Sequence, residues 1–140
     1  MDYETICNCF IGVFQHYKDD SQRKIFVVHE SRNDFPELVK FLNTCVAKKE
    51  WHISFNGLNF DAQITEQIIK EQNKLLKMNA DELVTYLYAY AQSVIDKSNK
   101  GVFLDYAPYK MKVKQIDLFK LNHWDNKAKM SKIGRAHVWT

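Results

Sequence analysis

The chain has 140 residues, of which 46% are hydrophobic and 26% are charged, and its formal net charge at pH 7 is +3. This length allows one domain with a hydrophobic core, and the composition excludes a disordered chain. The longest apolar run spans six residues, 9–14, whereas a membrane-spanning helix needs about 20. The first residues lack the basic and apolar regions of a signal peptide, and three cysteines do not make a disulfide framework. We therefore expect a cytoplasmic protein with no membrane partner.

The first third of the sequence has the apolar and aromatic content of strands, which we predict over residues 1–6, 10–17 and 23–29. The Asp-Asp-Ser segment between the last two favours a turn, so these strands form a hairpin. The period of the pattern then changes. Apolar residues recur with helical spacing at Phe35, Leu38, Val39, Leu42, Cys45 and Val46. This stripe predicts an amphipathic helix, which Asn33 or Asp34 can cap.

The remaining pattern predicts helices and strands in alternation: a strand over 51–55, a helix over 60–76, a helix over 80–95 and a strand over 113–121. An antiparallel three-strand meander followed by strands that helices connect is a mixed α/β architecture. This order suits the RNase H-like fold, although other α/β folds share it.

Two carboxylates stand at the start of the first predicted strand. Asp2 and Glu4 are two residues apart, so both side chains point to the same face of the sheet. Like charges at this distance repel unless a cation lies between them, and Mg²⁺ or Mn²⁺ prefers such hard oxygen ligands. The alternative is a solvated pair at the end of a strand, which is the commoner meaning of Asp-x-Glu alone.

The second candidate segment, residues 55–61 (FNGLNFD), lies where a predicted strand ends and a helix begins. Ligand sites of open α/β sheets lie at the carboxyl ends of strands. Asp61 can also have a simpler role at the positive end of the helix dipole, and Asn56 can be a turn residue.

Together these segments resemble the first two motifs of the DEDD 3′–5′ exonucleases, and most closely the proofreading domain of family B DNA polymerases, particularly those of phages. The first motif of that family is Asp-x-Glu, here Asp2 and Glu4. The second is Asn, a short spacer, an aromatic residue and Asp, here Asn56, Phe60 and Asp61. The resemblance covers about residues 2–125, and it implies an RNase H-like fold.

The resemblance also implies a two-metal phosphodiester hydrolysis that removes nucleotides from a single-stranded DNA 3′ end. Asp2 and Glu4 would bind one Mg²⁺ or Mn²⁺ ion, and Asp2 with Asp61 the second. Asn56 and Phe60 would place the 3′-terminal nucleotides, since aromatic stacking tolerates any base. The rest of a polymerase chain would be a further partner, in the cytoplasm of a phage or bacterial replication system.

One part of the family pattern is missing. The third motif, Tyr-x-x-x-Asp, supplies a fourth acid, but Asp does not stand four residues after Tyr86, Tyr90, Tyr106 or Tyr109. We therefore expect residues 1–132 to be a partial exonuclease domain. Residues 133–140 (IGRAHVWT) resemble translated sequencing-adapter DNA and are expected to be a non-native tail. A stand-alone DEDD exonuclease on DNA or RNA and a non-catalytic nucleic-acid-binding module of the same fold are the alternatives.

Overall fold

The structure is a computed structural model, and it describes residues 1–125. The expected tail, 133–140, lies outside these residues, as does the end of the expected exonuclease domain. Two 3₁₀ helices are labelled η. The elements follow one another in this order: β1 (Asp2–Ile6), β2 (Cys9–Gln15), β3 (Arg23–His29), β4 (Arg32–Asn33), α1 (Phe35–Ala47), β5 (Trp51–Ser54), η1 (Gly57–Asn59), α2 (Asp61–Lys70), α3 (Gln72–Leu75), α4 (Ala80–Asn99), η2 (Pro108–Lys110), β6 (Lys114–Asp117) and α5 (Leu118–Asp125).

The first four strands form an antiparallel sheet in the order β1-β2-β3-β4. Its register places Asp2 opposite Val13 and Phe10 opposite Val28. Asp19 shapes the β2–β3 turn, because its carboxylate accepts hydrogen bonds from the backbone N–H and the hydroxyl of Ser21. The predicted meander is therefore confirmed. The sequence pattern did not indicate the two-residue strand β4.

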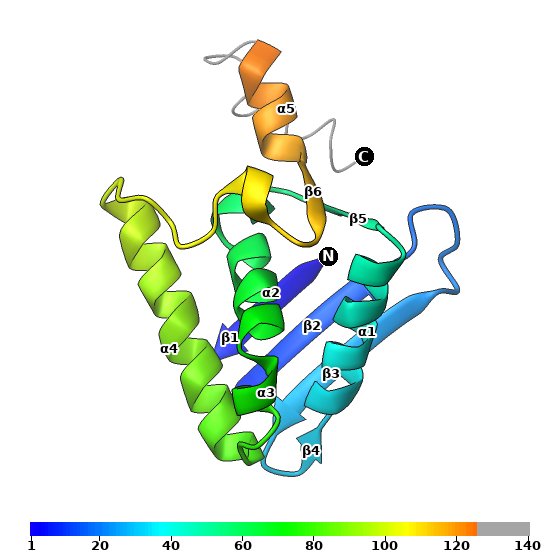
Figure 1. The fold of residues 1–140 in the computed structure, drawn as a ribbon, viewed down its shortest axis with the longest axis vertical. Helices are drawn as coiled ribbons and strands as arrows, with labels where there is room; N and C mark the ends of the chain where they lie inside the picture. The colour runs from blue at the N-terminus through cyan, green and yellow to red at the C-terminus, as the bar shows by residue number, and fades with distance from the viewer. Residues whose placement is uncertain (126–140) are drawn as a thin grey trace.

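Strands β5 and β6 form a second, parallel sheet. Parallel neighbours need a crossover connection, and helices α2, α3 and α4 lie in the chain between these two strands. The two sheets meet near the start of β1, where the Met1 ammonium donates a hydrogen bond to the Ile53 carbonyl oxygen (3.2 Å). Figure 1 shows β5 and β6 beyond this end of β1. The architecture is thus mixed α/β.

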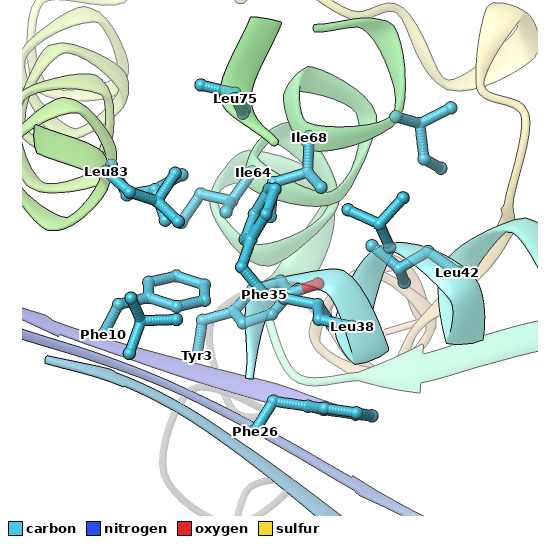
Figure 2. Packing of buried hydrophobic residues seen from close by; sticks show 14 of the residues in the cluster. Tyr3, Phe10, Phe26, Phe35, Leu38, Leu42, Ile64, Ile68, Leu75 and Leu83 are labelled. Carbon is cyan, nitrogen blue, oxygen red and sulfur yellow. The ribbon is translucent and has the colours of Figure 1, made fainter. Parts of the chain in front are cut away.

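Helices α1, α2 and α4 cover one face of the four-strand sheet (Figure 1). The core lies between that face and the helices, as Figure 2 shows for Tyr3 and Phe10 from the sheet, Leu38 from α1 and Ile64 from α2. Phe10 and Leu38 are completely buried. The helical stripe predicted from the sequence therefore packs against the inward residues of β1, β2 and β3.

Besides shifts of one or two residues at strand ends, three predicted elements differ from the structure. The helix expected over 60–76 is divided at Glu71 into α2 and α3. The helix expected to end at residue 95 continues to Asn99, and the chain then turns at Gly101 with φ +69°. The strand expected over 113–121 ends at Asp117, because the Asp117 carboxylate accepts a hydrogen bond from the Phe119 N–H (3.1 Å) and the chain turns there into α5.

Candidate active site

The two carboxylates of β1 lie on the sheet face that the helices leave uncovered. Asp2 and Glu4 are exposed, whereas Tyr3 between them is buried in the core. This alternation follows from the period of two in a strand. On the neighbouring strand, Val13 is opposite Asp2 and Ile11 is opposite Glu4.

Asp61 begins α2 and reaches the backbone of β1. The Tyr3 N–H donates a hydrogen bond to Asp61 Oδ1, with an N–O distance of 3.0 Å. A second bond one turn further along the helix joins the Tyr3 hydroxyl to Thr65 Oγ1 (2.8 Å). Tyr3 therefore holds α2 against the strand through its backbone and its side chain, and it brings the Asp61 carboxylate to the stretch of backbone between Asp2 and Glu4.

The surroundings of Asp61 disfavour its charged form. Burial is the largest cause that raises its pKa, to about 7, and the charges of Asp2 and Glu4 raise it further. The Tyr3 N–H and the Met1 ammonium act in the opposite direction. Asp61 is 7% exposed, so little water offsets the repulsion between the carboxylates. The charges of Asp2 and Glu4 thus act on the buried carboxylate of Asp61.

The loop before α2 carries the other two candidate residues. Asn56 is exposed and has a left-handed backbone conformation (φ 59°, ψ 23°), which Asn tolerates better than most residues. Its side-chain oxygen accepts a hydrogen bond from Asn59 Nδ2 (3.2 Å). Phe60 is partly buried and packs against the hydrophobic core. The structure therefore places Asn56 at the surface of the loop and Phe60 at its base.

Two polar residues near this loop escaped the sequence analysis. Asp117 is 4% exposed, and its carboxylate accepts hydrogen bonds from the backbone N–H groups of Asn56 (2.7 Å) and Leu58 (3.3 Å). Ser54 is buried at the end of β5, and within the described part of the chain its hydroxyl has no hydrogen-bond partner. The only signal for Asp117 was a carboxylate between the apolar residues Ile116 and Leu118.

Ser54 and Asp61 lie close to the same point of the loop. A Cβ atom placed on Gly57 would overlap the Ser54 side chain and lie 3.7 Å from Asp61 Oδ2. Only glycine therefore lets the loop pack this tightly over the end of β5. Gly57 brings the unpartnered hydroxyl and the second oxygen of Asp61 into one small region.

Among the described residues there is no group of three or more His, Cys, Asp or Glu side chains arranged to hold a metal ion. No helix within residues 1–125 combines the length and the hydropathy that a membrane span needs. Comparisons of the chain with protein-family models, with curated proteins and with solved structures found no match.

Proposed function

We propose that this chain is an RNase H-like domain that acts as a metal-dependent 3′–5′ exonuclease on single-stranded DNA, as the proofreading part of a family B DNA polymerase. The arrangement of the strands supports the fold assignment. The contact of Met1 with Ile53 sets β5 beside the start of β1, and β6 pairs in parallel with β5. This neighbourhood places the two sheets one after the other, β4-β3-β2-β1 and then β5-β6, with the carboxylates of β1 near their junction.

One observation carries the proposed activity: the hydrogen bond from the Tyr3 N–H to Asp61 Oδ1. It joins two motifs that are 58 residues apart in the sequence. Without it, Asp2, Glu4 and Asp61 would be three unrelated acids. With it, the Asp61 carboxylate lies at the strand that carries the other two acids; burial raises its pKa most, and the charges of Asp2 and Glu4 raise it further.

Carboxylate oxygens are the ligands that Mg²⁺ and Mn²⁺ prefer. Mg²⁺ binds through one or two carboxylates and keeps further positions for water and substrate phosphates, so a site needs no group of three acids. After burial, Asp2 is the larger of the two acidic causes that raise the pKa of Asp61. As the resemblance implies, Asp2 and Asp61 would hold one ion, and Asp2 with Glu4 the other. Bound ions would supply charge stabilisation for the attacking and leaving oxygens of a phosphodiester.

Residues of the chain would position the acids and bind the nucleotides. The hydrogen bond from Tyr3 keeps Asp61 in place, and burial excludes water from its carboxylate. Asn56 is exposed in the loop before α2, and its amide would bind a nucleotide. Phe60 would offer part of its ring to a base, because half-buried aromatics serve as sequence-tolerant stacking surfaces.

Titration with Mn²⁺ tests the metal site. We expect calorimetry to show Mn²⁺ binding to the 140-residue chain and at least a tenfold weaker affinity in Asp61→Asn, which keeps the acceptor for Tyr3 but removes the charge. Glu66→Gln is the matched control, because Glu66 is as buried as Asp61 but bonds to residues 112 and 113 instead of β1. Equal affinities in the wild type and in Asp61→Asn would contradict the assignment.

Degradation of a 5′-labelled single-stranded oligonucleotide tests the reaction. A version of the protein that carries a third motif, Tyr-x-x-x-Asp, after residue 132 should shorten the DNA from its 3′ end in Mg²⁺, and Asp2→Asn in that version should slow the reaction at least 100-fold. The exposed hairpin variant Asp20→Asn should match the wild type. Tight binding of DNA without degradation would instead support the non-catalytic module, and cleavage of RNA alone would support the stand-alone enzyme.

A further inference from the structure

The carboxylate of Asp117 is bonded to three backbone N–H groups at the end of the second sheet. Oδ1 accepts from Asn56 (2.7 Å) and from Phe119 (3.1 Å), and Oδ2 accepts from Leu58 (3.3 Å). Asp117 is opposite Ser54 in the parallel pair, at the last position of β6. Its exposed fraction is only 4%. Both carboxylate oxygens of the buried Asp117 therefore accept hydrogen bonds from the backbone.

Two of these bonds fix the beginning of the loop that leads to Asp61. The N–H of Asn56 and the N–H of Leu58 converge on the same carboxylate, which is consistent with the left-handed backbone of Asn56 (φ 59°) between the end of β5 and η1. Charge-assisted bonds to backbone N–H groups are about twice as strong as neutral ones. The close packing of Gly57 on Ser54 then leaves the loop no room to move toward β5.

The loop ends at the acid of the candidate site. Gln63, in the first turns of α2, adds a further restraint, since its amide donates to the carbonyl oxygens of Leu58 (3.0 Å) and Tyr106 (2.9 Å). The position of η1 therefore depends on Asp117 on one side and on α2 on the other. A displaced loop would shift Asn56 and Phe60 directly and the first turn of α2 indirectly.

We propose that Asp117 is a positioning residue of the candidate exonuclease site: it sets the loop of residues 55–60, and through that loop it sets Asp61, without contacting substrate or metal. This inference rests on the proposed function for the identity of the site. It does not follow from the two motifs, because neither of them contains Asp117.

The test compares Asp117→Asn with Glu66→Gln in the 140-residue chain. Both substitutions replace a 4%-exposed carboxylate that accepts backbone N–H groups, and both leave at least one N–H facing an amide nitrogen. Only Asp117 bonds to the loop. Hydrogen exchange resolved along the sequence should show at least tenfold faster exchange at Leu58 in Asp117→Asn, and unchanged exchange there in Glu66→Gln.

Mn²⁺ affinity, measured on folded protein, is the second readout. We expect it to weaken about tenfold in Asp117→Asn and to stay within twofold of the wild type in Glu66→Gln. Unchanged exchange at Leu58 would overturn the inference, and so would equal losses of affinity in both variants. If the wild type itself binds no Mn²⁺, the proposed function fails, whereas the exchange data still decide whether Asp117 positions the loop.

Discussion

Helix α2 carries two buried carboxylates whose surroundings differ. Glu66 accepts two backbone N–H groups, from Lys112 (2.8 Å) and Val113 (3.2 Å), and so ties the segment before β6 to the helix. Asp61, one turn and a half earlier, accepts one, from Tyr3, and the charges of Asp2 and Glu4 add to the effect of burial in raising its pKa. A buried anion needs hydrogen bonds or a cation. The comparison indicates that Glu66 has a structural role, whereas Asp61 has fewer hydrogen bonds to offset the burial of its charge.

The largest effect on the free energy of unfolding is expected for the substitution of Glu66. Glu66→Ala leaves the N–H groups of Lys112 and Val113 without their acceptor, at about 1–3 kcal/mol each, so we expect the free energy of unfolding to fall by about 4 kcal/mol. Urea denaturation measures it. Glu37→Ala, on the exposed side of α1, should change it by less than about 0.5 kcal/mol. A loss below about 1 kcal/mol for Glu66→Ala would remove the contrast between the two carboxylates.

Asp61 should make the protein less stable as the pH rises. Its pKa is raised from 3.8 to about 7, so between these values the unfolded chain releases a proton that the folded protein keeps. The contribution of this group to stability is therefore greatest below about pH 4, and it falls by roughly 4 kcal/mol as the pH rises through 7.

The measurement is the difference in unfolding free energy between the wild type and Asp61→Asn from pH 4.5 to 8. Asp61→Asn lacks the titrating group, so it should gain stability relative to the wild type across that range. Burial also lowers the pKa of His52, to about 4, but His52 is present in both proteins and cancels in the difference. A difference independent of pH would show that Asp61 is solvated like a surface acid.

A third kind of carboxylate gives the smallest effect. Asp105 is 40% exposed and pairs with Lys97, with an Nζ–Oδ1 distance of 2.6 Å. Exposed pairs contribute about 0.2–1 kcal/mol, so Lys97→Ala should lower the unfolding free energy by about 0.5 kcal/mol, and 0.5 M NaCl should reduce that loss. Thermal denaturation at two salt concentrations checks this. A loss of unfolding free energy above about 2 kcal/mol would show that Asp105 stabilises the fold as much as the buried carboxylates do.

Local patterns in the sequence were sufficient for β3 and α1. The strand 23–29 and the helical stripe from Phe35 depend on neighbours a few residues apart, and both elements form where the pattern indicated. Asp2, Glu4 and Asp61 were grouped through the resemblance to two short motifs; the structure joins Asp61 to Tyr3 between the other two acids, and their common role stays a prediction.

The hydrogen bonds between residues far apart in the sequence could not be predicted from local patterns. Asp117 bonds to residues 59 and 61 positions earlier, and Glu66 to residues 46 and 47 positions later. A carboxylate between apolar residues has the same local pattern whether it faces water or a buried loop. The end of β6 was predicted wrongly for the same reason. The Asp117 carboxylate bonds to the Phe119 N–H where α5 begins, whereas the apolar pattern of residues 118–121 is also typical of a strand.

The parallel pairing of β5 with β6 has a consequence for the order of folding. Their register joins residues 63 positions apart, from Trp51 with Lys114 to Ser54 with Asp117. Contacts of such separation are slow to form, because the loss of chain entropy precedes the gain. During synthesis the β1–β3 meander can form as soon as it leaves the ribosome. The loop of residues 55–60, however, has no Asp117 to hold it until nearly the whole described chain has emerged. We therefore expect the acids of β1 to be in place early and their partner loop to order last.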